Sequence, residues 1–472
     1  MIAMPATYPV TCHTNFVGPG STFVAIKGFL DNGLLYLDEA VAKGATHVVI
    51  AHDAVLTTRM QEQLKKHDVF VERVANPRQA LALLSAQAAG NPAQKMKIFG
   101  VTGTKGKTTT TSLMEHMLTS QGCKTALIGS ARNMINGVVL PAPLTTPQPD
   151  YLQQFLKLAF DNGVTHVVLE VAAQALSMHR IEGIMFDGVV FTNLDREHLE
   201  FYPTMEEYFA AKSMIFEYQK KKSVVLVNAD DMWCKKLESE YPRFSINDKS
   251  ALFYGAFIPS IDHAGIHASI SHEDNAYQLY CPALLGSYNL SNIVAAVGIL
   301  NLAGFEMQKL VESLSSFAGV PGRLEQYPLS NGALCVIDSA HNPLSFRAVL
   351  STLRSMTDKL IVVFGAAGDR DPGRRPEMGA IVAQYADVVI ITTDNPRTED
   401  PGDIADQVMT GISADAMQKT SIILDRGSAI KSAIEQSNKG AIIALLGKGT
   451  EEYQIVGNSK VPFSEKRLIK EL

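Results

Sequence analysis

The sequence predicts an α/β protein of three domains, and three observations lead to that prediction. The chain has 472 residues, a length that typically divides into about three domains. Apolar runs of strand length alternate with helix-like segments, which is typical of parallel sheets covered by helices. A polar stretch at 89–95 and a turn-rich stretch at 319–323 interrupt this alternation. We therefore expect a small N-terminal α/β domain (1–92), a central domain with a parallel sheet (93–320) and a C-terminal doubly wound, Rossmann-like domain (321–472).

Composition narrows the class of protein. The formal net charge is −6, so no sequence-wide basic face is expected, and a small-molecule substrate is favoured over nucleic acid as a partner. The five cysteines are far apart in the sequence, which argues against a disulfide framework or a zinc site and suits a reducing compartment. No basic start precedes a long apolar run, and no apolar stretch approaches the roughly 20 residues of a membrane span. We expect a cytoplasmic protein without membrane insertion.

The N-terminal domain is expected to be a small α/β layer, because its strand and helix signals are short and alternate as far as the polar linker. Its predicted elements are strand Thr22–Ile26, helix Leu37–Ala42, strand His47–Ile50 and helix Pro77–Ala89.

The central and C-terminal domains are each expected to hold a parallel sheet with helices on both faces. For the central domain the predicted strands are Met96–Val101, Thr125–Ile128, His166–Val171, Gly188–Asn193 and Ser223–Asn228, and the helices are Thr109–Leu118, Tyr151–Asn162, Met205–Tyr218 and Leu290–Ala303. For the C-terminal domain the strands are Ala333–Asp338, Lys359–Phe364, Asp387–Thr392, Thr420–Leu424 and Ala441–Leu446, and the helices are Leu344–Met356, Arg375–Tyr385, Gly402–Gly411 and Gly427–Gln436.

The segment Gly100–Thr109 is the most informative in the chain. It reads Gly-Val-Thr-Gly-Thr-Lys-Gly-Lys-Thr-Thr and joins an expected strand to an expected helix. Glycines in such a turn let backbone N–H groups close on an anion, a lysine reaches the terminal phosphates, and a hydroxyl can hold Mg²⁺. The strict phosphate-loop pattern has a glycine at the place of Val101, so a chance glycine turn is the alternative. The expected ATP-binding residues are Gly103, Thr104, Lys105, Gly106, Lys107, Thr108 and Thr109, with Lys107 acting on phosphate and Thr108 on Mg²⁺.

Three charged side chains are expected close to the carboxyl edge of the central sheet, where ligands bind in this fold class. Glu170 follows an apolar strand and could hold Mg²⁺. His198 follows the strand Gly188–Asn193, and Lys212 lies among apolar neighbours on a predicted helix. The alternatives are an ordinary loop histidine bonded to the backbone and a lysine that reaches solvent along its helix.

Taken together, these motifs resemble the Mur ligase family, ATP-dependent enzymes that join amino acids to the peptide stem of bacterial cell-wall precursors. The family loop Gly-Thr-x-Gly-Lys-Thr-Thr matches Gly103–Thr109, and Asn193–His198 is similar to its Asn-Leu-x-x-Asp-His, with Glu197 in place of aspartate. The resemblance covers nearly the whole chain and implies a central P-loop ATPase domain that uses ATP and Mg²⁺. It implies that the catalytic residues are Lys107, Glu170, His198 and Lys212. Within that set, Glu170 and His198 would be magnesium ligands, and Lys212 would be carbamylated and so able to share a second Mg²⁺.

Three later stretches also resemble family motifs that contact ATP. Gly286–Asn292 is similar to Gly-x-x-Asn-x-x-Asn, whose last residue, here Asn292, contacts adenine. Gly319–Arg323 is similar to Gly-x-x-Gly-Arg, which implies that Arg323 reaches the phosphates. Asp338–Pro343 is similar to Asp-x-Ala-His-x-Pro, which implies ATP contacts from Asp338 and His341.

One segment of the C-terminal domain indicates which amino acid is added. Asp394, Asn395, Pro396 and Arg397 match the Asp-Asn-Pro-Arg of the family members that add diaminopimelate. Diaminopimelate has a distal carboxylate, and a guanidinium binds a carboxylate through two parallel hydrogen bonds. A simple Asx-Pro turn with a solvated arginine is the alternative. Further residues implied for the amino-acid site are Arg370, Gly447 and Glu451.

The acceptor site only partly matches the family. Thr145, Thr146 and Arg180 match its substrate-contacting residues, and Thr14 keeps the hydroxyl of the Asp-Ser-Arg that helps to hold uridine diphosphate in the N-terminal domain. The departures are His13 and Asn15 beside Thr14, Ala172, Ala173 and Gln174 in place of Ser-Ser-His, Lys105 in place of asparagine and Thr450 in place of histidine.

The resemblance implies an ATP-dependent carboxylate–amine ligase. The first hypothesis is that the enzyme adds meso-diaminopimelate to UDP-N-acetylmuramoyl-L-alanyl-D-glutamate through an acyl phosphate, during peptidoglycan precursor synthesis. The alternatives are a related ligase that acts on a different carboxylate acceptor and a regulatory protein that binds ATP without catalysis. The resemblance also implies a monomer.

Overall fold

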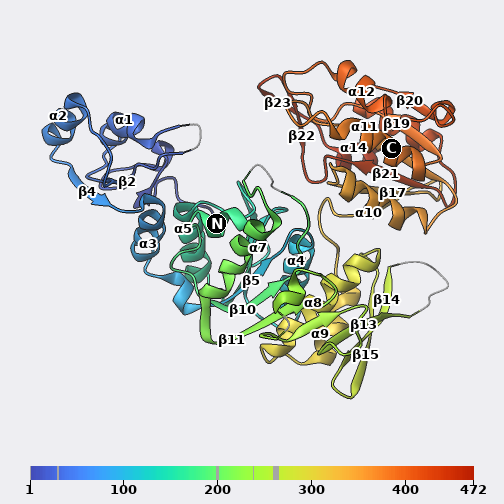
Figure 1. Ribbon diagram of the computed structural model, residues 1–472, viewed down its shortest axis with the longest axis horizontal. Coiled ribbons are helices and arrows are strands. Elements are labelled where there is room, and N and C mark those ends of the chain that lie inside the picture. The colour runs from blue at the N-terminus through green and yellow to red at the C-terminus, as the bar shows by residue number, and fades with distance from the viewer. Residues whose placement is uncertain (1, 29–30, 198–200, 238, 259–264) are drawn as a thin grey trace. The chain divides into compact units, whose positions relative to one another are not determined.

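The computed structural model describes residues 2–28, 31–197, 201–237, 239–258 and 265–472. The chain divides into two compact units (Figure 1). The N-terminal unit comprises Met1–Ile258, Ala268–Leu279 and Leu290–Ser315, and the C-terminal unit comprises Pro259–His267, Tyr280–Asn289 and Ser316–Leu472. The three-domain division, with boundaries near residues 92 and 320, stays a prediction.

A small parallel sheet forms the first part of the N-terminal unit. Its four strands run in the order β1 (Val10–Thr11), β2 (Thr22–Val24), β3 (His47–Ala51) and β4 (Phe70–Val74). The helices are α1 (Leu37–Ala42), α2 (Thr58–Lys66) and α3 (Pro77–Ala88). Alternate residues of β3 enter different apolar clusters, Val48 on the side of α1 and Val49 on the side of α3, because successive strand side chains point to opposite faces.

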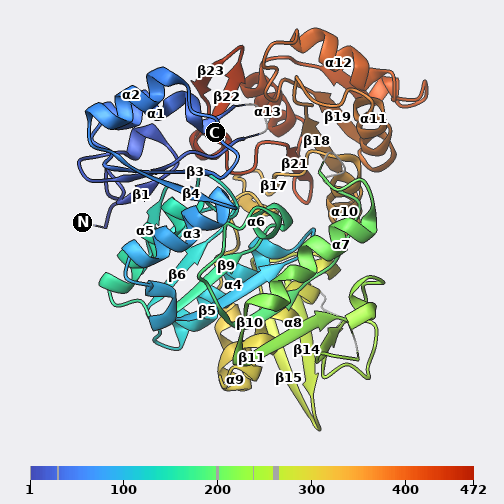
Figure 2. The same cartoon turned by 60° about the vertical axis from the view of Figure 1, so that its left-hand side comes forward.

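A sheet of eleven strands forms the rest of the N-terminal unit, in the order β15-β14-β13-β12-β11-β10-β5-β9-β6-β7-β8. Its middle strands are parallel, as predicted: β5 (Lys97–Thr102), β6 (Thr125–Ile128), β9 (His166–Glu170), β10 (Phe186–Phe191) and β11 (Gln219–Asn228). Figure 2 shows β5, β9 and β10 beside α4. Because these strands are parallel, their carboxyl ends lie at one edge of the sheet.

The outer strands of this sheet were not predicted. They are β7 (Asn133–Ile135), β8 (Val138–Leu140), β12 (Arg243–Ser245), β13 (Phe253–Phe257), β14 (Ile266–His272) and β15 (Asn275–Cys281). The pairs β6–β7, β7–β8 and β13–β14 are antiparallel. The associated helices are α4 (Lys107–Ser120), α5 (Pro149–Asp161), α6 (Ala173–Ser177), α7 (Met205–Ser213), α8 (Ser287–Leu302) and α9 (Met307–Ser313). The helix predicted as Met205–Tyr218 is α-helical only to Ser213 and ends in a 3₁₀ turn, Met214–Tyr218.

The C-terminal unit is doubly wound, as predicted. Its sheet runs in the order β16-β17-β21-β18-β19-β20. The strands are β16 (Glu325–Pro328), β17 (Leu334–Asp338), β18 (Leu360–Phe364), β19 (Val388–Ile391), β20 (Thr420–Ile422) and β21 (Ile442–Leu446), and only β16 is antiparallel to its neighbour. A separate hairpin pairs β22 (Tyr453–Val456) with β23 (Ser459–Pro462).

Helices cover both faces of this sheet. They are α10 (Pro343–Arg354), α11 (Arg374–Tyr385), α12 (Pro401–Met409), α13 (Arg426–Glu435) and α14 (Glu465–Glu471). Val336 of β17 packs in the apolar cluster of α10, α11 and α12, whereas Ile337 packs in that of α13 and α14. No helix within the described part of the chain is long and apolar enough to cross a membrane.

Candidate active site

The phosphate loop joins β5 to α4 through two glycines with positive φ, at which a side chain would be strained and would crowd a neighbouring polar side chain. Gly103 has φ +143° and Gly106 has φ +84°. A Cβ at Gly103 would lie 2.0 Å from Thr192 Oγ1, and one at Gly106 would lie 2.3 Å from Asn292 Oδ1. The loop therefore passes tightly over β10 and α8 before α4 begins at Lys107, which places the N-terminus of α4 at the carboxyl edge of the sheet.

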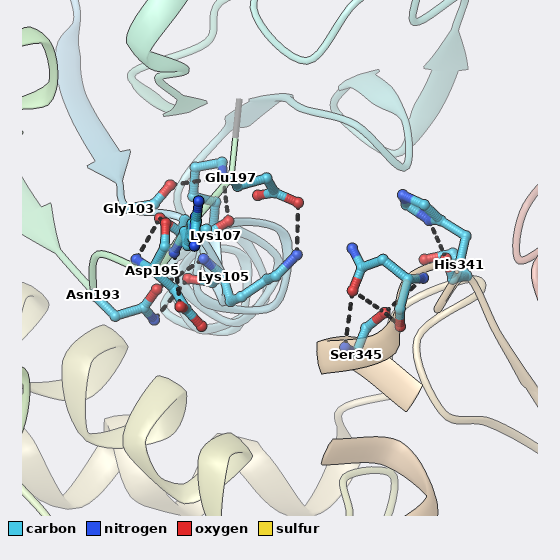
Figure 3. Close-up of polar contacts among 12 residues, drawn as sticks. Gly103, Lys105, Lys107, Asn193, Asp195, Glu197, His341 and Ser345 are labelled. Carbon is cyan, nitrogen blue, oxygen red and sulfur yellow. Dashed lines mark hydrogen bonds and ion pairs between the residues drawn. The ribbon is translucent and has the colours of Figure 1, made fainter. Parts of the chain in front are cut away.

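Two lysines converge on the carbonyl oxygen of Gly103 (Figure 3 shows Lys107 on the loop). Lys107 Nζ donates to Gly103 O at 2.8 Å and to Thr104 O at 2.9 Å, and Lys212 Nζ donates to Gly103 O at 2.7 Å. The Lys212 side chain is 1% exposed. Burial, followed by the nearby charge of Lys107, lowers the pKa of Lys212 well below its ordinary value, which favours the neutral amine.

The end of β10 clamps the backbone of the loop. Asn193 Oδ1 accepts from Lys105 N at 2.8 Å, and Lys105 O accepts from Asn193 Nδ2 at 3.1 Å and from Thr192 Oγ1 at 2.7 Å. Lys105 Nζ forms an ion pair with Glu197 Oε1 at 2.8 Å (Figure 3). Asp195 N donates to Thr104 Oγ1 at 3.0 Å. The Asn193–His198 segment thus lies against the phosphate loop as far as Glu197; His198 lies outside the described residues.

Glu170 lies at the end of β9 and is buried beside the first turn of α4. Its Oε2 accepts from Thr108 Oγ1 at 3.1 Å and from Ser130 Oγ at 3.1 Å, and its Oε1 accepts from Ser130 N at 2.8 Å. This group of carboxylate and hydroxyl oxygens has the donor chemistry that Mg²⁺ prefers. Within the described residues, no three His, Cys, Asp or Glu side chains form a metal-binding cluster.

The remaining predicted nucleotide residue of the N-terminal unit lies beside the loop. Asn292, on α8, accepts a hydrogen bond at Oδ1 from Thr110 Oγ1 of α4, at 3.4 Å. Thr109 is buried in the first turn of the same helix.

The predicted acceptor residues lie next to Glu170. Thr146 Oγ1 donates to Glu170 O at 2.7 Å and accepts from Ala172 N at 3.0 Å, while Arg180 Nη1 donates to Thr146 O at 3.0 Å. Thr145 Oγ1 is 2.9 Å from Ser130 Oγ.

Thr14 is buried in the small N-terminal sheet region, and its carbonyl accepts from Lys43 Nζ at 3.1 Å. The departures that flank it pair with one another, because Asn15 N donates to His13 Nδ1 at 3.1 Å. Ala173 and Gln174 begin α6. No hydrogen bond joins Thr14 to Thr145, Thr146 or Arg180 among the described contacts.

In the C-terminal unit, the residues predicted to reach ATP lie at the end of β17. Asp338 accepts from Leu324 N at 2.8 Å and from Ala340 N at 2.7 Å. Burial raises the pKa of Asp338, and the positive charge of Arg323 opposes that shift. Arg323 Nη1 donates to Ser339 Oγ, and His341 Nδ1 is 2.8 Å from Ser339 O (Figure 3).

The predicted amino-acid residue Asn395, after β19, forms a hydrogen-bonded polar group with Lys448 and Glu451, which follow β21; Lys448 is buried and Glu451 is partly exposed. Lys448 Nζ donates to Asn395 Oδ1 at 2.9 Å and to Glu451 Oε2 at 2.6 Å, and Asn395 Nδ2 donates to the same Glu451 oxygen at 2.9 Å. Asp394 is buried, which raises the pKa of its carboxyl against the charges of Arg426 and Lys448.

The remaining predicted residues of this site are Pro396, Gly447, Arg397 and Arg370. Pro396 is buried. Gly447 N donates to Asp338 O at 3.0 Å. Arg397 has φ +54°, its backbone pairs with Ile455 and Gly457 beside the hairpin, and its Nε is buried with no hydrogen-bond partner among the described residues. Arg370 is exposed on the loop after β18.

Sequence reasoning missed several residues that hold this site. Lys448 lies between Gly447 and Gly449, in the motif that ends at Glu451. A basic residue flanked by two glycines could have indicated a site residue. Ser130 and the pair Arg375–Glu399 have no comparable signal, since their partners are distant in sequence.

The chain matches known proteins along nearly its whole length. Residues 101–300 match the family model of the Mur ligase middle domain, and residues 322–449 match that of the Mur ligase glutamate ligase domain. A UDP-N-acetylmuramoyl-L-alanyl-D-glutamate–2,6-diaminopimelate ligase of Nostoc sp. is 36% identical over 466 residues, covering 97% of this chain and 92% of the relative. The ligase of the same name from Caldanaerobacter subterraneus is 35% identical over 463 residues, covering 96% and 92%.

Solved structures agree with this match. A structure of a UDP-N-acetylmuramoyl-L-alanyl-D-glutamate–2,6-diaminopimelate ligase has a TM-score of 0.69 and 29% sequence identity, with 98% of this chain and 94% of that chain covered. The two domain models, the relatives and the fold lead to one conclusion: the chain belongs to the Mur ligase family.

Proposed function

We propose that this protein is an ATP-dependent carboxylate–amine ligase that adds meso-diaminopimelate to UDP-N-acetylmuramoyl-L-alanyl-D-glutamate in peptidoglycan precursor synthesis. The observation that carries the proposal is the match, along 97% of the chain, to a relative with that printed name. The hydrogen-bonded group formed by Asn395, Lys448 and Glu451 supports it, because it joins residues of the two motifs proposed for the amino-acid site.

The reaction would proceed in two steps. A carboxylate oxygen of the acceptor forms a bond to the γ-phosphorus of ATP, and the bond from that phosphorus to the bridging oxygen breaks, which releases ADP. The amine of diaminopimelate then forms the C–N bond, the C–O bond to phosphate breaks, and the amine loses a proton. Lys107, at the start of α4, would stabilise charge on the transferring phosphoryl group, with help from Arg323.

We propose ATP-binding residues in each unit. In the N-terminal unit, the residues are Gly103–Thr109 and Asn292. In the C-terminal unit, they are Arg323, Asp338 and His341. Mg²⁺ would neutralise phosphate charge when bound. The hydroxyl of Thr108 and the carboxylate of Glu170, with His198, would hold it. Lys212 would contribute after carbamylation, for which its lowered pKa is suitable, because the neutral amine is the form that reacts with carbon dioxide.

The amino-acid site would use charge complementarity. Arg370 and Arg397 would bind carboxylate groups of diaminopimelate through paired hydrogen bonds. Glu451 would bind an ammonium through Oε1, because its Oε2 already accepts from Lys448 and Asn395. Asp394, Asn395, Pro396 and Gly447 would complete the site.

The acceptor would bind in the N-terminal unit. Thr145, Thr146 and Arg180 would contact the muramoyl dipeptide, and Thr14 the uridine diphosphate group. Ala172 presents no hydroxyl, but its backbone N–H is already satisfied by Thr146 Oγ1 at 3.0 Å. We further propose that the protein acts as a cytoplasmic monomer without nucleic-acid partners.

Phosphate release by the purified protein tests the proposal. The assay contains ATP, Mg²⁺ and UDP-N-acetylmuramoyl-L-alanyl-D-glutamate, with diaminopimelate, lysine or no amino acid. We expect release that depends on both the dipeptide and diaminopimelate. ATP-dependent release with another carboxylate acceptor, but none with this one, would instead identify a ligase with a different acceptor. Binding of ATP without turnover on any acceptor would identify a regulatory protein.

A further inference from the structure

One ion pair, between buried Arg375 and partly exposed Glu399, connects two loops of the C-terminal unit, the β18 loop (residues 365–373) and the β19 loop (residues 392–400). Arg375, in the first turn of α11, is 1% exposed. Its Nη1 is 2.7 Å from Glu399 Oε2 and its Nη2 is 2.9 Å from Glu399 Oε1. Nη2 also donates to Ala367 O at 3.2 Å, and Nη1 to Gln407 Oε1 at 2.7 Å. One guanidinium therefore holds the backbone of the β18 loop and the end of the β19 loop.

The two loops also touch directly. Gly368 N donates to Asn395 O at 2.9 Å, and a Cβ at Gly368 would lie 1.9 Å from Pro396 O. Asp369 N donates to Glu399 Oε1 at 2.5 Å, and Thr398 Oγ1 donates to Asp369 Oδ1 at 2.6 Å. Because these contacts extend from Gly368 to Thr398, a change at the ion pair would shift both loops together.

Each loop carries an arginine of the proposed amino-acid site. Arg370 follows Asp369 in the β18 loop, and Arg397 precedes Thr398 in the β19 loop, so both lie next to residues that the loops use to contact each other. The Arg375 guanidinium is buried, and both its terminal nitrogens are hydrogen-bonded inside the protein. Arg375 is thus placed to act on a ligand through the loops and not by contact.

We propose that Arg375 and Glu399 are positioning residues that set the separation of Arg370 and Arg397 and thereby select an amino acid with two carboxylates. This inference rests on the proposed function. Paired hydrogen bonds to a carboxylate tolerate displacements of only about half an ångström, so the spacing of two guanidinium groups determines whether one ligand can satisfy both. A bidentate Arg–Glu pair is suited to this task, because its planar fork allows one relative orientation.

Glu399 stays ionised in the working pH range. Arg375 and the Asp369 N–H lower the pKa of Glu399 to about 2. The ion pair between Arg375 and Glu399 is therefore a constant feature of the folded C-terminal unit and not a pH-sensitive switch.

Three variants test the inference in the full-length protein. Arg375→Lys keeps the charge but loses the fork, Glu399→Gln keeps the shape but loses the charge, and Thr398→Val removes one contact between the loops at an exposed position. The matched control is Arg354→Lys, because Arg354 forms an ion pair with Asp387 at 2.6 Å in the same unit but outside the two loops. For each protein we would measure the unfolding temperature and, by phosphate release, separate KM values for diaminopimelate, ATP and the dipeptide.

We expect the KM for diaminopimelate to rise about tenfold or more in Arg375→Lys and Glu399→Gln, and about threefold in Thr398→Val. The KM values for ATP and the dipeptide should stay at the wild-type level, and the control should match the wild type throughout. A general loss of structure would lower kcat without this selective change. If Arg375→Lys or Glu399→Gln fails to fold, the KM of Thr398→Val for diaminopimelate decides whether the inference holds.

Two results would overturn the inference, and they differ in what they say of the proposed function. If the wild type uses diaminopimelate and the folded variants keep its wild-type KM, the positioning role is wrong and the proposed function stands. If the wild type shows no release that depends on diaminopimelate, the proposed function fails, and the selection role fails with it.

Discussion

Lys107 is the residue with the most direct part in the proposed phosphoryl transfer, since its ammonium lies on the phosphate loop at the start of α4. We expect Lys107→Ala to lower the rate of phosphate release at least about a hundredfold, because a preorganised charge on the transferring group is lost. The control is Lys157→Ala, which removes an exposed lysine paired with Asp161 on α5. Activity of Lys107→Ala within about twofold of the control would contradict the role.

Arg397 is expected to determine affinity for diaminopimelate. Arg397→Lys keeps the positive charge but replaces a planar fork with a point charge, so paired hydrogen bonds to a carboxylate are lost. The KM for diaminopimelate should rise about tenfold or more, while the KM for ATP should not change. Arg347→Lys, at a half-exposed position on α10, is the control. An unchanged KM for diaminopimelate in Arg397→Lys would show that this guanidinium is not a ligand.

Individual site residues were predictable where a short motif carries them. Adjacent residues in the sequence form the motifs that contain Lys107, Thr108 and Asp394–Arg397. In the structure, Lys107 and Thr108 lie in the surroundings that the phosphate-loop motif predicts. Glu399 was not predictable in this way, because its meaning depends on Arg375, which is 24 residues away in sequence. Their roles in catalysis and binding stay predictions.

At the scale of elements, the two ends of α4 offer a matched pair of glycines. Gly106 precedes α4 with φ +84°, and Gly122 follows it with φ +78°. A Cβ at Gly106 would lie 2.3 Å from Asn292 Oδ1, whereas a Cβ at Gly122 would meet nothing within 4 Å. Gly122→Ala should cost about 1 kcal/mol from its backbone conformation alone. Gly106→Ala should cost about 1–3 kcal/mol more and weaken ATP binding.

Urea unfolding and nucleotide titration measure these two effects. Equal destabilisation by Gly106→Ala and Gly122→Ala would mean that the loop moves away from α8 at little cost. That result would contradict the close packing of the phosphate loop on Asn292.

The ion pair between Arg375 and Glu399, which connects the β18 and β19 loops, should make the stability of the fold depend on pH. The pKa of Glu399 is lowered from its ordinary value of 4.5 to about 2, so its ion pair stabilises the fold above the unfolded-state pKa and loses this effect as the pH falls toward 2. The difference in unfolding free energy between the wild type and Glu399→Gln should be constant above about pH 5 and shrink as the solution becomes more acidic. Urea titrations over a pH series measure it. A difference that is independent of pH would rule out an ion-pair contribution.

Buried strands were the most predictable elements. The interior strands β5, β9 and β10 are mostly apolar and largely buried, because both faces of a parallel sheet are covered. The outer strands β7, β8 and β15 are short or largely exposed, so their sequences carry a weaker signal. The early end of α7 at Ser213 was also missed, since a 3₁₀ turn continues the same helical pattern.

At the scale of the whole molecule, the residues proposed for one ATP belong to both units. The phosphate loop lies in the N-terminal unit, and Arg323 and His341 lie in the C-terminal unit. If all of them bind one nucleotide, we expect the substrate-bound enzyme to adopt a closed state, which would also exclude water from the acyl phosphate. We expect the radius of gyration from small-angle X-ray scattering to fall when a non-hydrolysable ATP analogue and the dipeptide are added.

The control for this measurement is Lys107→Ala with the same ligands, which should show a smaller change because it binds the phosphates less well. An unchanged radius of gyration in the wild type, with binding shown independently, would contradict closure. The nucleotide residues of one of the units would then need another explanation.

The sequence by itself determined the α/β class, the interior strands, the phosphate loop and the membership in a ligase family. These features depend on apolar periodicity and on motifs whose residues are neighbours in the chain, so local chemistry specifies them. Only the tertiary structure decided which side chains meet. In the structure, Lys212 donates a hydrogen bond to Gly103 O, Thr108 donates one to Glu170, and Arg375 forms an ion pair with Glu399. Such contacts depend on the order of strands in a sheet and on the paths of loops between them, which no short stretch of sequence encodes.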